Sequence, residues 1–343
     1  MTDLTAFALG LPKAELHLHL EGTLEPELKF ALAARNGIAL DQKTVEDVRA
    51  TYDFTDLTSF LAVYYPAMQV LQTADDFHDL AWAYLQRAQA QGVVHVEMFF
   101  DPQAHTSRGV PFSNVITGYR RAAVRAQAEL GISAELILCF LRDFSAEYAM
   151  ATLMEALPYK AWIVGVGLDS DERDNPPAKF AAVFARARQE GFFLTMHCDI
   201  DQVGSVDNIR TVLTEIGVDR IDHGTNIVED PDLVALAIEK GIGFTTCPVS
   251  NSFVTEQMKA DEIVSLMRQG AKVTLNSDDP AYFGAYVGDT YVRLAEYAGL
   301  SETDLVQLAV NSFDASWLTP ARRAEFVARV TDYATAHGVP LPA

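Results

Sequence analysis

Residues 163–168 read Ile163-Val164-Gly165-Val166-Gly167-Leu168, a run that is apolar at every position. A strand with one face in water alternates apolar and polar residues, whereas a parallel strand buried on both faces does not. Residues 177–190 follow with apolar spacing of three and four, and Gly191 stands where a helix is expected to end. Another apolar run comes next at 192–196, so the segment predicts a strand–helix–strand unit.

The same alternation extends over the chain. Helix-like segments at 112–130, 177–190, 206–216 and 231–240 separate apolar runs. Strand–helix alternation repeated eight times predicts an α/β fold, a (β/α)8 TIM barrel, as a single domain over residues 1–343. A doubly wound open sheet is less favoured, because no glycine-rich phosphate loop follows the first strand. The expected strands are 14–19, 93–100, 134–140, 163–168, 192–196, 220–223, 241–247 and 272–276.

A long gap separates the first two expected strands. It holds helical segments at 25–35, 44–50, 57–68 and 74–91, interpreted as an insertion over the barrel mouth that helps to form a lid. Aromatic residues in it are expected to pack, and some of them to line an apolar wall: Phe54, Phe60, Tyr64 and Tyr65. Residues 301–337 are expected to form closing helices.

Composition excludes several classes of protein. A formal charge of −21 argues against binding to nucleic acid. The chain lacks both an 18-residue apolar stretch and a basic N-terminal region, so neither a membrane span nor a secretory signal is expected. Three cysteines without a CxxC spacing suit a reducing, cytoplasmic setting. Whether the chain forms a homo-oligomer is left open.

Histidines and carboxylates stand at the ends of four expected strands. His17 and His19 end the first, and alternate residues of a strand point the same way. An HxH pair alone is as often a pair of ordinary half-buried histidines. However, His197 ends the fifth strand, His223 the sixth and Asp278-Asp279 the eighth. Because strand ends meet at one face of a barrel, these residues predict a metal site.

The ligand types favour one zinc ion with room for a water molecule, although iron, cobalt or manganese would accept the same ligands. A second ion needs a bridging ligand, often a lysine of the fourth strand, and 163–168 contains none. A metal ion of this kind lowers the pKa of its water toward neutrality.

The chain resembles the adenosine and adenine deaminases of the amidohydrolase superfamily, nearly end to end. The motifs that carry the resemblance are LPKAELHLHLEGT at 11–23, RIDHG at 220–224, TCPVSN at 246–251 and NSDDPAYFG at 276–284. It implies metal ligation by His17, His19, His197 and Asp278. It also implies that His223 orients or deprotonates the attacking water and that Asp279 contacts the purine at N7.

The implied reaction is hydrolytic deamination at C6 of a 6-aminopurine, in which ring nitrogen N1 must take a proton. The family motif on the fifth strand, His-Ala-Gly-Glu, supplies that acid from its glutamate. This chain has His197-Cys198-Asp199-Ile200-Asp201 instead. We expect Asp199 to be the acid, because a two-residue offset from His197 aims it inward. Asp201 is the alternative, and it suits a turn before the next helix.

Two positions favour a free base. Glu21 stands where nucleoside deaminases of this family have a shorter aspartate that meets the ribose, and is expected to crowd the sugar. Asp169 and Ser170 follow the fourth strand and are expected to contact N3 and N9–H, unless they only cap the next turn. The predicted substrate is adenine. Alternatives are an N6-substituted, cytokinin-like adenine or adenosine, a purine-binding regulatory protein without turnover, and an amidohydrolase of another class.

Overall fold

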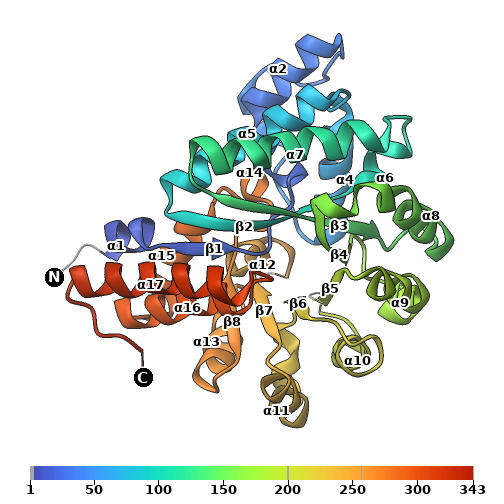
Figure 1. Ribbon diagram of the computed structural model, residues 1–343. Helices are drawn as coiled ribbons and strands as arrows, with labels where there is room; N and C mark the ends of the chain where they lie inside the picture. Colours follow the sequence, from blue (N-terminus) through green and yellow to red (C-terminus); the bar gives the residue numbers. More distant parts are fainter. Residues whose placement is uncertain (1–3, 199–200, 256, 343) are drawn as a thin grey trace.

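The computed structural model describes residues 4–198, 201–255 and 257–342. Its centre is an eight-stranded sheet in which every neighbouring pair is parallel and the strand order follows the chain (Figure 1). A bridge between Leu18 and Asp278 joins the first strand to the last, so the sheet closes into the predicted (β/α)8 barrel. The strands are β1 (Lys13–Glu15), β2 (Val93–Phe100), β3 (Ser133–Leu141), β4 (Ile163–Asp169), β5 (Phe193–Cys198), β6 (Arg220–His223), β7 (Gly243–Thr246) and β8 (Lys272–Leu275).

The first strand is shorter than the predicted 14–19. Regular pairing of β1 with β2 ends at Glu15, and single bridges join Leu18 to Asp278 and His19 to Phe99. The chain beyond Glu15 therefore pairs with both neighbours in turn, which interrupts the regular ladder on either side. His17 and His19 still point to one side, since the imidazoles of both face Asp278.

Helices surround the strands (Figure 1). The predicted helix stop at Gly191 is confirmed, because this residue closes α9 in the left-handed conformation with φ of 91°. The structure also has α8 and α13, which were not predicted from the sequence. The helices on and around the barrel are α1 (Leu4–Gly10), α6 (Pro102–Thr106), α7 (Phe112–Glu129), α8 (Ala146–Ala156), α9 (Ala181–Glu190), α10 (Ser205–Thr211), α11 (Pro231–Glu239), α12 (Pro248–Val254), α13 (Ala260–Arg268), α14 (Pro280–Phe283), α15 (Val287–Ala298), α16 (Glu302–Asp314) and α17 (Pro320–Ala336).

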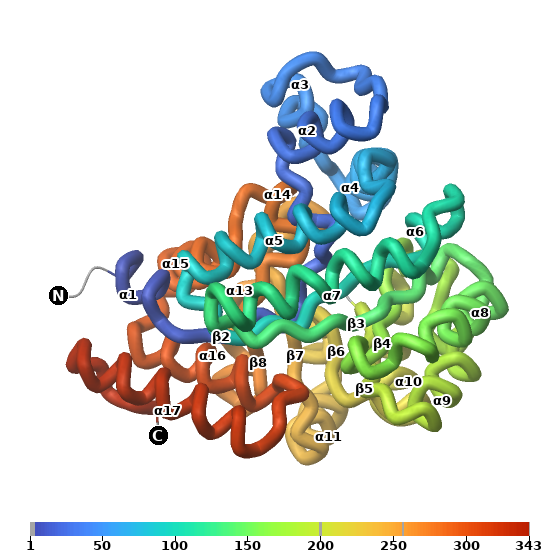
Figure 2. The backbone as a smooth tube through the Cα atoms, turned by 45° about the horizontal axis from the view of Figure 1, so that its top comes forward, coloured from blue at the N-terminus to red at the C-terminus, as the bar shows by residue number. Residues whose placement is uncertain are grey.

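The predicted insertion comprises α2 (Pro26–Asn36), α3 (Val45–Arg49), α4 (Leu57–Ala67) and α5 (Ala74–Ala90). In Figure 2, α2 and α3 stand clear of the barrel at the top of the view, and α4 lies below them. Asp56 caps α4 by accepting a hydrogen bond from the amide of Ser59, whose hydroxyl accepts one from the amide of Asp56 in return. No helix in the described ranges is long and apolar enough to cross a membrane.

An ion pair between β2 and β6 is buried inside the barrel. Arg220 on β6 donates Nη1 to Oε2 of Glu97 on β2 at 2.5 Å, and neither side chain is more than 1% exposed. Arg220 also donates to the carbonyl of Leu16 at 3.2 Å. Burial opposes the charge of Glu97, but Arg220 and His95 outweigh it and lower the pKa of this carboxyl. The pair therefore links β1, β2 and β6.

We expect the Arg220→Met variant to lose about 3–5 kcal/mol of unfolding free energy, because Glu97 would stay buried without its main counter-charge. Urea denaturation measures the loss. Arg329→Met is the matched control, since its partner Glu325 is exposed and such pairs contribute about 0–1 kcal/mol. Equal losses in the two variants would contradict this account of the buried pair.

Candidate metal centre and active site

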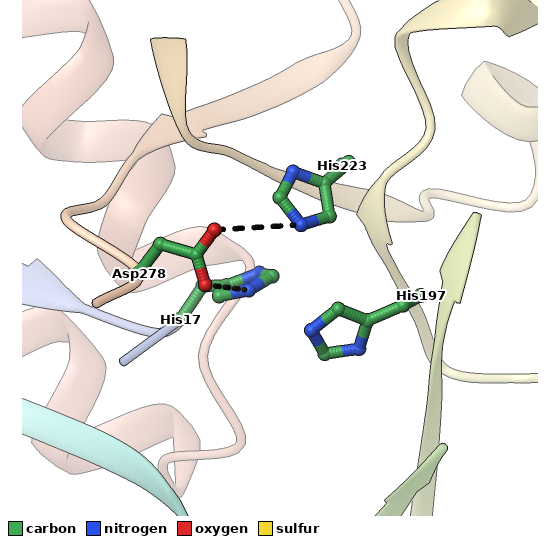
Figure 3. A group of neighbouring side chains, drawn as sticks. All are labelled: His17, His197, His223 and Asp278. Carbon is green, nitrogen blue, oxygen red and sulfur yellow. Dashed lines mark ion pairs between the residues drawn. The ribbon is translucent and has the colours of Figure 1, made fainter. Parts of the chain in front are cut away.

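Four histidines and one aspartate converge at the C-terminal ends of the strands. His17 Nε2 lies 3.2 Å and His19 Nε2 3.4 Å from the same oxygen, Oδ1 of Asp278. His19 Nε2 lies 3.1 Å from His197 Nε2, and His223 Nε2 lies 3.8 Å from Asp278 Oδ2. All five residues are at most 6% exposed. Figure 3 shows four of these side chains around a common space. Their convergence at one face of the barrel was predicted from the sequence.

Closure of the barrel positions the aspartate. The amide of Asp278 donates to the carbonyl of His17 at 3.1 Å, and the amide of His19 donates to the carbonyl of Asp278 at 3.0 Å. Below them, the Leu16 amide donates to Oδ1 of Asn276 at 2.8 Å. Backbone pairing between β1 and β8 thus sets the carboxylate against both imidazoles.

The outer nitrogen of each of three imidazoles faces an oxygen. His17 Nδ1 lies 3.0 Å from Thr245 Oγ1, His19 Nδ1 lies 3.5 Å from Asp169 Oδ2, and His197 Nδ1 lies 3.4 Å from Asp222 Oδ2. Asp222 Oδ1 also accepts a 2.8 Å hydrogen bond from Thr245. A proton on Nδ1 leaves the Nε2 lone pair directed at the centre, as metal ligation requires. One carboxylate, Asp222, therefore orients two imidazoles.

The spacing of these atoms fits a divalent metal ion. Two ligand atoms at about 2.0–2.2 Å from one ion, about 90–110° apart, are separated by about 2.8–3.6 Å. The measured separations of 3.1, 3.2 and 3.4 Å fall in this range. Burial lowers the pKa of His17 and of His197, which favours the neutral, ligating form. His17 Nε2 has no hydrogen-bond partner in the part of the chain that the structure describes.

Strained backbone marks two of the five residues. His223 has φ of 57° and Asp278 has φ of 64°, in the left-handed region that side chains rarely adopt. Ser250 donates to Asp278 Oδ2 at 2.6 Å, which turns Oδ1 toward the imidazoles. His17, His197, His223 and Asp278 can each place one ligand atom within 4.8 Å of the others. Spacing alone therefore does not distinguish His223 from a metal ligand.

The pKa values of the two adjacent aspartates are shifted in opposite directions, although burial acts in the same direction on both. Burial would raise the pKa of Asp278, but the facing imidazoles outweigh it and hold this pKa well below its usual range. Burial and the adjacent Asp278 raise the pKa of Asp279 well above its usual range. Asp278 is thus held in its charged, ligating form, whereas Asp279 favours its protonated form.

A cavity opens above the cluster, and side chains of α4, in the predicted insertion, belong to its lining. The floor and rim of this cavity are polar, and its cover is mainly apolar and aromatic. Phe60, Tyr64 and Tyr65 belong to its lining, whereas Phe54 packs behind them against Phe60. The lining residues are His19, Leu57, Phe60, Leu61, Tyr64, Tyr65, Asp101, Asp169, Ser170, His197, His223, Ser250, Val254, Asp278, Asp279 and Phe283.

The three predicted substrate contacts, Asp279, Asp169 and Ser170, all line this cavity. Asp169 also faces the outer nitrogen of His19, which sequence reasoning did not anticipate. Ser170 adopts φ of 72° and accepts a 2.8 Å hydrogen bond from the Tyr65 hydroxyl. These two residues therefore do more than cap a turn.

Glu21 lies elsewhere than expected. It is fully buried and accepts hydrogen bonds on Oε1 from His105 Nε2 at 2.9 Å and from the Tyr119 hydroxyl at 2.8 Å. The described cavity lining does not include it, so its side chain does not crowd a sugar directly. Two donors behind the wall draw this carboxylate away from the cavity, and Asp101 lines the wall instead.

Asp199, the expected acid, lies outside the described residues. The alternative acid, Asp201, is bound to side chains outside the cavity. Its carboxylate forms an ion pair with Lys259 Nζ at 2.8 Å and accepts a hydrogen bond from Asn226 Nδ2 at 2.9 Å. The side chain of Asp201 is 51% exposed and lines a separate hollow with Lys259 and Asn226. It therefore occupies the outer turn that the sequence suggested for it.

Sequence reasoning missed three supporting residues. Asp222 and Ser250 belong to motifs that were recognised in the sequence. Their contacts are with side chains distant in the chain, so residue spacing within the motifs does not predict them. Asp101 directly follows the apolar strand at 93–100. The rule that selected His197, His223 and Asp278, a polar residue ending a strand, would have selected Asp101 too.

Comparisons with known proteins agree over nearly the whole chain. A family model described as adenosine deaminase matches residues 12–333. The adenine deaminase of Rhodospirillum rubrum is 50% identical over 327 residues, covering 95% of this chain and 97% of that protein. The crystal structure of an adenine deaminase from Arthrobacter aurescens aligns with a TM-score of 0.91 at 42% identity, over 95% and 99% of the two chains. An amidohydrolase from Burkholderia ambifaria, crystallised with bound zinc, aligns with a TM-score of 0.89 at 27% identity, over 98% and 95%.

We expect Asp222→Asn to weaken metal binding by about 10- to 100-fold, because asparagine is uncharged and keeps only one accepting oxygen, so it cannot face His197 Nδ1 and accept from Thr245 at the same time. Competition with a chromogenic chelator at fixed pH measures the metal dissociation constant. Asp232→Asn, at an exposed aspartate in the first turn of α11, is the matched control. Unchanged affinity in Asp222→Asn would show that Asp222 does not position the imidazoles.

Proposed function

The chain belongs to the adenosine deaminase family, and we propose that it catalyses the hydrolytic deamination of the free base adenine. Adenine and water give hypoxanthine and ammonia: a C6–O bond forms and the exocyclic C6–N bond breaks. The observation that carries the proposal is the His and Asp cluster, which forms the floor of a small cavity with a polar rim. Support for adenine comes from relatives of that name, which match almost the full length of the chain.

His17, His19, His197 and Asp278 are the proposed ligands of one zinc ion. Their Nε2 and Oδ1 atoms lie 3.1–3.4 Å apart where measured, and three imidazoles with one carboxylate leave a position open for water. A bound divalent metal supplies Lewis-acid activation of a water molecule. The zinc in the Burkholderia ambifaria amidohydrolase supports this choice, and iron or manganese would accept the same donor set.

His223 is the proposed proton carrier. Its Nε2 lies 3.8 Å from the Asp278 oxygen that Ser250 holds, on the cavity side of the cluster. From there the imidazole can accept a proton from the attacking water and return it to the leaving amine. The left-handed backbone fixes this side chain in place, since the following Gly224 has φ of 71° and the turn is tight.

The remaining groups hold the base. Asp279 is proposed to contact N7, and Asp169 and Ser170 the edge that carries N3 and N9–H. The aromatic rings of Phe60 and Tyr64 in the cover suit a flat ring. For the proton that N1 must receive, we propose Asp199 on its offset of two residues from His197, because Asp201 is bound to Lys259.

A substrate panel on the metal-loaded protein tests the proposed function. The panel compares adenine, N6-methyladenine, N6-isopentenyladenine, adenosine and AMP by release of ammonia and by the ultraviolet spectrum of the product. We expect kcat/KM for adenine to exceed that for adenosine and for AMP by about tenfold or more, because a site that pairs with N9–H of a free base rejects analogues that lack it. The two N6-alkylated bases keep N9–H, and their comparison with adenine tests the alternative substrate class.

Two variants control the panel. His223→Ala should keep its metal content and lose turnover, which excludes a contaminating deaminase. Unchanged turnover in Asp199→Asn would remove Asp199 from the role of acid. A preference for an N6-alkylated base or for adenosine would overturn the assignment to adenine, and binding without turnover of any compound would indicate a regulatory protein.

A further inference from the structure

Asp101 follows the last residue of β2 and lines the cavity beside Asp169 and Tyr65. We propose that, on the edge of the base assigned above to Asp169 and Ser170, the Asp101 carboxylate is the group that accepts a hydrogen bond from N9–H, with N3 left to Ser170, and that Asp101 thereby excludes purines substituted at N9. The inference rests on the proposed deamination and concerns how the same cavity selects its substrate.

One carboxylate oxygen of Asp101 is buried in the cavity wall without a hydrogen-bond donor among the described residues. Asp101 is 1% exposed, and its Oδ1 has no hydrogen-bond partner among the residues that the structure describes. Leaving a buried acceptor unpaired is costly, so such atoms in a cavity wall usually meet a ligand or ordered water. The Tyr64 hydroxyl in the same wall is likewise buried without a partner in the described chain.

Buried side chains fix Asp101 from behind. Its backbone amide lies 3.5 Å from Glu21 Oε1, and Glu21 is held by His105 and Tyr119. Glu21, His105 and Tyr119 are all 0% exposed. The wall is therefore closed on this side, and a group larger than hydrogen at N9 would meet a packed surface rather than an opening.

The position of Asp101 also matches the geometry of a purine. His19 can group with Asp278 and Asp279, and separately with Asp101 and Asp169, with ligand atoms within 4.8 Å of one another in each group. Asp278 faces His19 at Nε2, whereas Asp169 faces it at Nδ1, so the two groups lie on different sides of the ring. In a purine, N7 and N9 are separated by the single atom C8. A base with N7 at Asp279 can therefore present N9 to Asp101, because Asp279 is also among the charges that act on the Asp101 carboxyl group.

The chemistry of N9 distinguishes the two substrate classes. A free base in its common tautomer carries N9–H, which donates a hydrogen bond, whereas a nucleoside carries a glycosidic carbon and no proton there. A site that hydrogen-bonds a substrate N–H discriminates strongly against the analogue that lacks it, because its own polar group is left unpaired. A nucleoside would therefore be disfavoured for two reasons: the Asp101 carboxylate would lose its hydrogen-bond donor, and the wall leaves no space for a sugar at N9.

The test compares adenine with 9-methyladenine, which differs only in losing N9–H and gaining a methyl group. In Asp101→Ala we expect kcat/KM for adenine to fall by about 10- to 100-fold and that for 9-methyladenine to stay unchanged or rise, because the unpaired acceptor and the side chain that crowds the methyl group are both removed. Asp101→Asn keeps an oxygen acceptor and should retain most of the discrimination. Asp143→Asn, at an exposed aspartate just after β3, is the matched control and should change neither substrate.

Binding of the products repeats the comparison without turnover. Titration calorimetry with hypoxanthine and 9-methylhypoxanthine should show the same selective loss in Asp101→Ala, in samples of equal metal content and melting temperature. An equal loss for the methylated and unmethylated ligands would overturn the proposal, as would a wild-type protein that does not distinguish them. Failure of the proposed function would be seen separately, as absent turnover of adenine by wild-type protein.

Discussion

The closure of the barrel between β1 and β8 is the constraint on which the site depends. The bridge of Leu18 with Asp278, and the backbone hydrogen bonds of His17 and His19 to Asp278, bring the two ends of the sheet together. Because ladder pairing fixes the positions of side chains, closure places one carboxylate oxygen 3.2 and 3.4 Å from two imidazoles that lie about 260 residues earlier in the chain. The fold and the proposed metal site thus share the same contacts.

Buried polar contacts then hold the cluster in a ligating state. Asp222 orients the imidazoles of His17, through Thr245, and of His197. Its neighbour in the barrel, Arg220, lies 3.9 Å away through Nε and is paired with Glu97. These charges compensate one another in a region that excludes water, which makes each of them costly to remove. Ser250 and the strained backbone at Asp278 complete the arrangement from the side of β7 and β8.

Much of the fold was predictable because a parallel strand that is buried on both faces consists of a continuous run of apolar residues, which can be recognised in the sequence. All eight strands were expected, and the ends of β2 and β6 were placed to the residue, whereas β1 ends four residues early because its chain leaves the ladder to pair with both neighbours. The convergence of His17, His19, His197, His223 and Asp278 followed from their positions at strand ends. The direction of Glu21 did not, because it depends on two distant donors, His105 and Tyr119. Contacts of this kind leave no periodic signal.

The central claim is that one metal ion is held where β1, β5 and β8 end. A crystal structure of the zinc-loaded protein, with anomalous difference maps recorded on both sides of the zinc absorption edge, tests it most directly. The account predicts one peak at about 2.0–2.2 Å from the Nε2 atoms of His17, His19 and His197 and from an oxygen of Asp278. A map without this peak, or with zinc only on the other side of His19, between Asp101 and Asp169, would contradict it.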